Sequence, residues 1–255
     1  MAERIDWDEC YRDFAAVWEQ RARDTPLKPI EPAATILERL GTPAPEDERW
    51  LIEALGDRAR KWFVAWAAGR ADVLSESLFR PMLDTAIDEV NPSANRSFIE
   101  PCMHAFGPRR VNRYLLSVVQ SGTDSRKAGA VNALYWAQVP LTFVGLPPEW
   151  TIEYATPESR AANEALADLQ ELKRKLLLAT FVSNENLHVR RSIIPQLSLD
   201  PAHHAPSDRP LVAQAIAIGR GHPDTYIRER TEVQLGNSSL LPPLPEREPE
   251  PPAAP

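Results

Sequence analysis

Hydrophobic residues recur mostly every three or four positions along the chain, which is the period of an α-helix. The longest stripe holds one side of a helix for four turns and consists of Ala165, Leu169, Leu172, Leu176 and Ala179. Alternation typical of strands is confined to residues 139–146 and 150–155, which fit a short strand, an extended connection or a small hairpin. The pattern therefore predicts an all-α protein.

Proline marks several of the expected helix boundaries. Pro108, Pro157 and Pro223 each stand just before a helical run, where the missing N–H removes no hydrogen bond. Seven of the 25 prolines fall in the last 14 residues, and few large apolar residues accompany them. Residues 237–255 are therefore expected to form a disordered, Pro-rich tail, whose PPLP run suits a polyproline-binding groove.

The helical segments contain a weak internal repeat. Residues 186–197 (NLHVRRSIIPQL) and 224–235 (DTYIRERTEVQL) both begin with a polar capping residue, followed three positions later by an apolar residue and then by Arg. In both, Leu follows seven positions after that Arg. Residues 123–134 fit the frame with Lys in place of Arg, and residues 95–106 fit only at their ends.

This frame resembles the second helix of the HEAT-like repeat family, in which paired helices stack into an α-solenoid. The resemblance covers residues 78–236. It implies irregular HEAT-like helical pairs over residues 71–236, with an insert at 139–156, preceded by an acidic helical N-terminal cap at 1–70. The repeats start 28, 63 and 38 positions apart, which is irregular for such arrays. An irregular multi-helix bundle remains the alternative.

The charge of the chain is uneven. The net charge of −7 disfavours nucleic-acid or anionic-membrane binding by the chain as a whole. Residues 1–106 hold 13 basic and 20 acidic side chains, whereas residues 107–236 hold 15 basic and 13 acidic ones. The N-terminus lacks the features of a signal peptide, no apolar run is long enough to cross a bilayer, and the two cysteines form no C-x-x-C pair. These features predict a cytoplasmic protein outside the membrane.

Common catalytic motifs are absent from the sequence, including phosphate-binding loops, G-x-S-x-G and H-E-x-x-H. The densest set of metal-capable residues is Asp200, His203, His204 and Asp208, but these lie in one loop without the spacing that fixes a coordination geometry. A solvated loop is the better interpretation. We therefore predict no catalytic residues, no cofactor and no metal site.

Aromatic and acidic residues on the expected helices allow a second interpretation. Trp62 and Trp66 share one helix face beside basic residues, but core packing accounts for them better than base stacking. One HEAT-like family, the alkylpurine DNA glycosylases, uses Trp and Asp on a concave face, and this sequence does not match that set residue by residue. Acidic pairs one turn apart, such as Asp84 and Asp88, fit solvated helix faces.

Basic residues of the C-terminal half are the best candidates for a binding surface. The resemblance assigns Arg190 and Arg228 to a ladder between repeats. The candidates for partner contact are Arg126, Lys127, Arg191, Arg230, Lys173 and Arg174. We expect a non-enzymatic protein-binding module or adaptor, such as a regulator, an assembly factor or a toxin-neutralising partner. The alternative is a nucleic-acid-binding protein or HEAT-like DNA glycosylase that uses the basic C-terminal half.

Overall fold

The computed structural model describes residues 5–21, 32–146 and 151–236, and the regular elements among these are helices. The helices are α1 (Trp7–Arg21), α2 (Ala34–Gly41), α3 (Pro45–Gly56), α4 (Lys61–Ala68), α5 (Phe79–Asp88), α6 (Arg96–Phe106), α7 (Pro108–Ser121), α8 (Asp124–Trp136), α9 (Pro157–Glu164), α10 (Ala167–Ser183), α11 (Leu187–Ile193), α12 (Arg209–Gly221) and α13 (Thr225–Gln234). Short 3₁₀ turns η1 (Glu76–Leu78), η2 (Ile152–Tyr154), η3 (Ile194–Gln196) and η4 (Pro201–His203) join them. Within the described ranges there is no strand, which confirms the all-α prediction. The expected tail at 237–255 lies outside the described residues.

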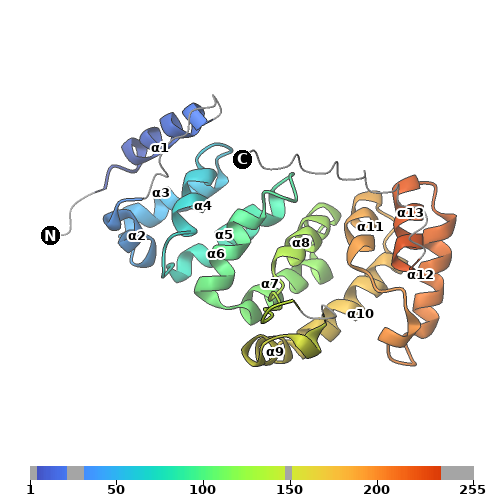
Figure 1. Cartoon of the computed structure of the whole chain (residues 1–255). Coiled ribbons are helices and arrows are strands. Elements are labelled where there is room, and N and C mark those ends of the chain that lie inside the picture. The colour runs from blue at the N-terminus through green and yellow to red at the C-terminus, as the bar shows by residue number, and fades with distance from the viewer. Residues whose placement is uncertain (1–4, 22–31, 147–150, 237–255) are drawn as a thin grey trace, which may run out of the picture.

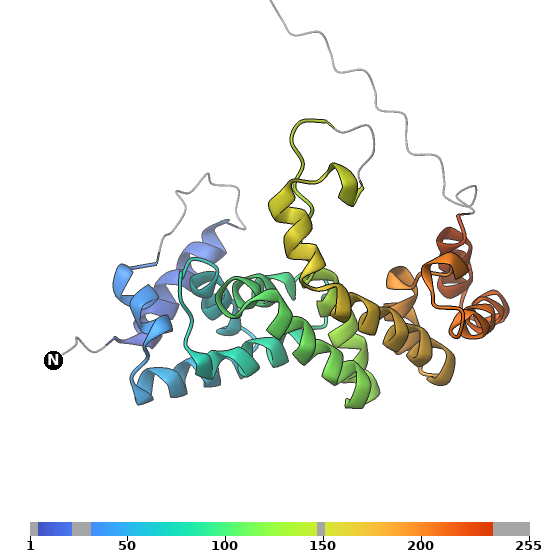
Figure 2. The same cartoon turned by 90° about the horizontal axis from the view of Figure 1, so that it is seen from below.

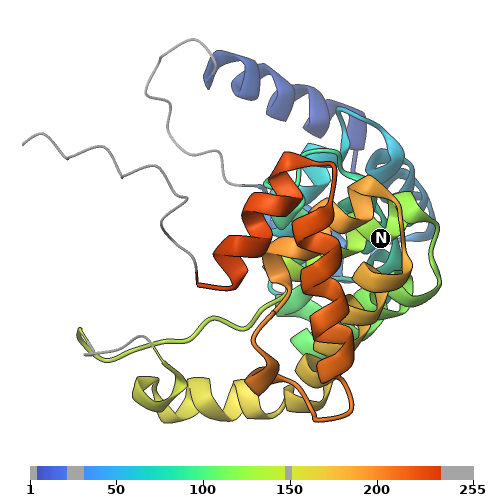
Figure 3. The same cartoon turned by 90° about the vertical axis from the view of Figure 1, so that its right-hand side faces the viewer.

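Consecutive helices pack as hairpins, namely α5 on α6, α7 on α8, α10 on α11 and α12 on α13. From α7 onward, the first helices of neighbouring hairpins contact each other, as do the second helices: α7 packs on α10 and α10 on α12, while α8 packs on α11 and α11 on α13. The preceding junction differs, because α5 packs on α8 and α6 on α7. The hairpins follow one another from left to right in chain order (Figure 1). Viewed from the C-terminal end, α12 and α13 lie in front, and α1 (blue) and α9 (yellow) stand clear of them on opposite sides (Figure 3). A single core of buried apolar side chains runs through these contacts.

Local sequence signals explain where several helices begin. Pro108 and Pro157 occupy the first helical positions of α7 and α9, as the sequence predicts. Gly107 ends α6 with a φ of 79°, a left-handed conformation that favours glycine, and so turns the chain into α7. Asn186 and Asp224 accept hydrogen bonds from backbone N–H groups at the starts of α11 and α13. Both helices of the sequence repeat are therefore capped as expected.

The N-terminal region is joined to the rest by aromatic and carboxylate contacts. Trp7 of α1 donates a 2.7 Å hydrogen bond from Nε1 to the buried Asp47 Oδ1 of α3. The Trp7 ring also stacks on Trp50, with centroids 5.5 Å apart. Helices α3 and α4 then pack on α5 and α6 respectively, so the region predicted as a cap adjoins the first hairpin of the row.

The two described parts of the insert, residues 139–146 and 151–156, lie side by side. Phe143 and Ala155 form an isolated antiparallel bridge, and the Thr156 N–H donates to the Thr142 carbonyl at 2.8 Å. The insert and α9 project together from one side of the row of hairpins (Figure 2). Within the described residues, no helix is both long and apolar enough to cross a bilayer.

The stripe expected at Ala165–Ala179 does not form the buried face of this segment. The helix breaks at Leu166, between α9 and α10, and Leu172 is 49% exposed. The face that α10 turns inward instead carries Leu166, Leu169, Leu177, Thr180 and Phe181. The segment is rich enough in leucine to offer two stripes of helical spacing, and tertiary packing selects the second.

Arg190 and Arg228, which are expected to form a ladder between repeats, direct their hydrogen bonds to the segments just before their own helices. Arg190 Nε donates to the Phe181 carbonyl at 3.2 Å, and Arg228 donates to the His222 and Pro223 carbonyls at 2.7 Å. Each arginine therefore fastens the turn before its own helix, because the unpaired carbonyls at the end of the preceding helix lie within its reach. These hydrogen bonds stay within one hairpin. Arg190 also acts on the next hairpin through its charge, because the pKa of His222 is lowered by burial and further by the nearby Arg190.

Candidate functional site

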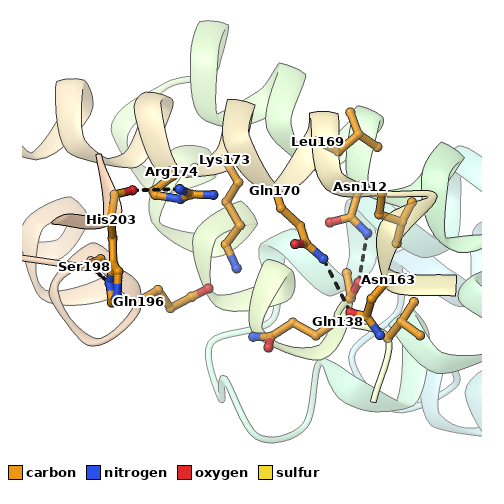
Figure 4. Close-up of a pocket in the computed structure, with 13 residues that line it drawn as sticks. Asn112, Gln138, Asn163, Leu169, Gln170, Lys173, Arg174, Gln196, Ser198 and His203 are labelled. Atoms are coloured by element: carbon orange, nitrogen blue, oxygen red, sulfur yellow. Dashed lines mark hydrogen bonds between the residues drawn. The ribbon is translucent and has the colours of Figure 1, made fainter. Parts of the chain in front are cut away.

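A groove of about 570 Å³ lies where α7, the end of α8, α9, α10 and the η3–η4 segment meet (Figure 4). Polar residues dominate its walls, and five of them are carboxamides: Asn112, Gln138, Asn163, Gln170 and Gln196. The other polar or charged lining residues are Lys173, Arg174, Ser198 and His203. Among the residues that line this groove there is no Asp or Glu.

Lys173 lies on the inward-facing side of α10. Its position continues the buried series of Leu166, Leu169 and Leu177 at spacings of three and four residues, so a charged side chain occupies what would otherwise be a core position. Removal from water lowers the pKa of the Lys173 ammonium to about 8. Within the described part of the chain, Lys173 forms no ion pair. It points from α10 into the groove (Figure 4).

Three of the carboxamides are fixed by their own NH₂ groups. Asn112 donates to the Ala137 carbonyl at 2.8 Å and Gln196 donates to the Val131 carbonyl at 2.6 Å. Asn163 donates to the Ser159 carbonyl at 3.0 Å. Since the nitrogen of each group is held by backbone, its oxygen is left as an oriented acceptor. The Oε1 atom of Gln196 is buried and has no hydrogen-bond partner among the described residues.

The wall opposite α7 is a loop that is fastened to α10. Arg174 donates to the His203 carbonyl at 2.7 Å and pairs with Glu171 on its own helix at 3.2 Å. The Ser198 hydroxyl lies 2.9 Å from Nδ1 of His203, and the buried His204 holds the Ser198 carbonyl at 2.9 Å. The loop is thus held in place by bonds to its own backbone and to α10.

The loop at residues 200–208, which the sequence predicts to be solvated, is only partly exposed, because the His204 side chain is 7% exposed. Asp200 caps η4 by accepting from the Ala202 N–H at 2.8 Å. Across the described residues, no three His, Cys, Asp or Glu side chains lie close enough together to hold a metal ion.

A second cavity of about 650 Å³ adjoins the groove and shares Gln196, Ser198 and His203 with it. Its far end is lined by Leu235 and Gly236, where the described part of the chain ends. The polar groove therefore continues along η3 as far as the C-terminal end of α13.

The six basic residues singled out from the sequence fall into three places. Lys173 and Arg174 line the groove. Arg191 lies on α11 and Arg230 on α13. Their guanidinium groups stack on the Tyr226 ring at 5.2 and 5.6 Å from its centroid. Arg191 and Tyr226 line a cavity of about 380 Å³ together with Tyr135 and Trp136.

Arg126 and Lys127 begin α8, away from both places. Arg126 is paired with Asp84 and, at 3.4 Å, with Asp88 on α5. The two aspartates expected on a solvated face therefore join α5 to α8. Lys127 is half-buried and forms no ion pair with a described residue.

Sequence reasoning missed the carboxamides of the groove. They lie between residues 112 and 196 on five separate elements, and nothing in their spacing groups them. The sequence signal that could have revealed the site is Lys173, a lysine at a position where the helical period places a core residue. This signal can be recognised only when it is known which face of α10 is buried.

Comparison of the chain with protein families, curated proteins and solved structures finds no match.

Proposed function

We propose that this chain is a non-enzymatic protein-binding module or adaptor, and that the groove beside α10 holds its partner. The observation that carries the proposal is the groove itself, which combines oriented carboxamide oxygens, an unpaired ammonium and a buried acceptor without a partner. Such groups are hydrogen-bonding sites that a partner can satisfy. A regulator, an assembly factor or a toxin-neutralising partner would all use a surface of this kind.

We also propose that the hairpins form an α-solenoid of irregular HEAT-like helical pairs. The contacts of α10 with α7 and α12 in one set of helices, and of α11 with α8 and α13 in the other, support this arrangement. Stacked helical pairs present extended surfaces that suit protein partners. Helix α9 then contributes Asn163 to one wall of the binding groove.

Site-specific photo-crosslinking in cells tests the protein-binding proposal. A photoreactive amino acid replaces Gln170, which is exposed at the groove, and a control variant carries it in place of Glu53, which is exposed on α3. We expect a discrete, protease-sensitive adduct from position 170 and none from position 53. The absence of a protein adduct at 170, or an adduct removed by nuclease, would contradict the proposal.

Nucleic-acid binding is the second candidate function, and one observation favours it. The guanidinium groups of Arg191 and Arg230 lie 5.2 and 5.6 Å from the centroid of the Tyr226 ring, so cations that can hold phosphates lie beside an aromatic residue. If this function holds, a labelled single-stranded oligonucleotide binds at low salt, and Arg191→Glu with Arg230→Glu removes the binding. No binding at low salt would end this candidate.

A glycosylase activity has less support than simple binding. Trp62 and Trp66 line a cavity of about 500 Å³ with Trp18, and both also pack against the core. The acidic lining residue there is Glu100, which pairs with Arg96 at 2.6 Å. The Trp and Asp set of the HEAT-like glycosylases is not matched among these lining residues.

A further inference from the structure

The side chain at the centre of the groove is a cation without a counter-charge. Lys173 is the one ammonium group among the residues that line the groove, and Arg174, its charged neighbour there, is already engaged by Glu171 and by the His203 carbonyl. Burial lowers the pKa of Lys173, but a value of about 8 leaves about nine tenths of the groups charged at pH 7. A ligand that brings a negative charge to Lys173 would relieve this unfavourable burial.

The carboxamides around Lys173 favour a peptide. Because the NH₂ groups of Asn112 and Gln196 are bonded to backbone carbonyls, their oxygens remain to accept from a ligand. The Asn163 oxygen already accepts from Gln170 at 3.4 Å. An extended peptide offers N–H groups on alternate sides about every 7 Å, which suits acceptors spread along a groove. Gln138 and the oxygen of Gln170 have no hydrogen-bond partner among the described residues and add further polar contacts.

The composition of the lining also argues against a nucleic acid in this groove. A single-strand site needs aromatic faces on which bases stack. Apart from the His203 imidazole, no lining residue is aromatic, whereas Tyr135, Trp136 and Tyr226 line a separate cavity with Arg191. The lining also contains no carboxylate that would repel an acidic peptide.

We propose that the groove binds an extended acidic peptide segment of the partner, with an Asp or Glu carboxylate on the Lys173 ammonium and main-chain N–H groups on the oxygens of Asn112 and Gln196. This inference rests on the proposed protein-binding function and names the chemistry of the segment that is bound. Gln196 Oε1 acquires the donor that it lacks among the described residues, and Lys173 acquires its counter-ion.

A phage-displayed library of random peptides, panned on the full chain, tests the inference. We expect the recovered peptides to share an Asp or Glu. In fluorescence-polarisation titrations with a labelled synthetic copy, changing that residue to Asn or Gln weakens binding by about tenfold or more. Lys173→Met weakens binding of the acidic peptide to the same extent, and combining both changes adds little further loss. Lys175→Met, on the same helix but already paired with Glu171 at 3.2 Å, is the matched control and changes binding by less than about twofold.

Several outcomes would overturn the inference, and they differ from a failure of the proposed function. Recovery of no peptide, or of peptides without an acid, would remove the acidic segment as the ligand. Binding that is indifferent to Lys173→Met would do the same, provided that thermal melting shows the variant to be folded. Displacement of the bound peptide by a single-stranded oligonucleotide would assign the groove to a phosphate ligand. If crosslinking at position 170 still captures a protein in these cases, the protein-binding function stands and only the ligand chemistry is wrong.

Discussion

Gly219 of α12 lies directly against Thr231 of α13, with no space between them for a methyl group. A Cβ atom at position 219 would lie 2.9 Å from Thr231 Cγ2 and 3.1 Å from Thr231 Cβ. Thr231 is itself fully buried, with its hydroxyl donating to the Ile227 carbonyl at 2.8 Å. The last hairpin therefore closes at a glycine that is required for space, rather than for backbone conformation.

Gly219→Ala is expected to lower the free energy of unfolding by about 1–3 kcal/mol, because one of the two helices must shift to admit the methyl group. Gly221→Ala, at the end of the same helix with open space around it, should leave stability unchanged or raise it by about 0.5 kcal/mol. Urea unfolding followed by circular dichroism measures both. Adding Thr231→Ala to Gly219→Ala should recover part of the loss, and no recovery would count against overpacking as the cause.

Lys173 should make stability depend on pH in a specific window. Its pKa is about 8 when folded and 10.5 ordinarily, so the unfolded chain holds more protons at this site between these values. Stability contributed by this site therefore rises as pH increases from 8 to 10.5, and below pH 8 the full penalty for burying the charge is present.

Replacing the ammonium by an apolar group of similar length tests this directly. Lys173→Met should stabilise the free protein at pH 7 by about 1–3 kcal/mol, and the gain should shrink as pH rises through the same window. Urea unfolding at several pH values gives the free energy of unfolding of wild type and variant. The contributions of the other titrating groups cancel in the difference between the two proteins. Lys175→Met should show no such trend, since that side chain is exposed. A difference in the free energy of unfolding between wild type and Lys173→Met that does not change with pH would contradict the lowered pKa of Lys173.

The pairs between Arg126 and the aspartates of α5 should contribute to stability through charge. Arg126→Glu brings a carboxylate next to Asp84 and Asp88, and we expect a loss of about 1 kcal/mol at low salt. High salt should reduce the loss, because these side chains are partly exposed to solvent. Lys127→Glu should cause a smaller loss in the free energy of unfolding, because Lys127 forms no ion pair with a described residue. Equal, salt-independent losses in the two variants would contradict a charge-based role.

Asp47 should anchor α1 to the rest of the chain. One oxygen accepts from Trp7 Nε1 and the other accepts from the Ala44 N–H at 3.1 Å, so Asp47→Asn turns an NH₂ group toward a donor. We expect a loss of about 1–3 kcal/mol, measured by urea unfolding with tryptophan fluorescence. Asp8→Asn, at the exposed hydrogen bond to Trp50, should stay within about 0.5 kcal/mol. A larger effect at Asp8 than at Asp47 would show that the exposed bond is the stronger attachment.

The all-helical fold class and several helix boundaries could be predicted from the sequence, because they depend on local signals. Pro108 and Pro157 mark first helical positions, and Asn186 and Asp224 cap the helices of the repeat. These residues act on backbone groups within a few positions, so their effect does not require the fold to be known.

What the sequence could not predict depends on contacts between distant segments. Arg126 meets Asp84 from 42 positions away, and the choice between two leucine stripes on α10 is made by packing against α7 and α12. Lys173 was singled out for its charge, but its burial follows only from that choice of face. The carboxamides of the groove are uncharged and do not recur at a regular spacing in the sequence, so only the fold shows that they lie together.

The cavity that links the groove to Gly236 bears on how binding to this protein can be measured. Gln196, Ser198 and His203 line both cavities, and the chain leaves α13 at the far end of the second one. An affinity tag, fluorophore or fused domain attached soon after Gly236 would stand beside the second cavity, which adjoins the groove. A label placed before α1, at the opposite end of the row of helices, stands away from both cavities (Figure 1).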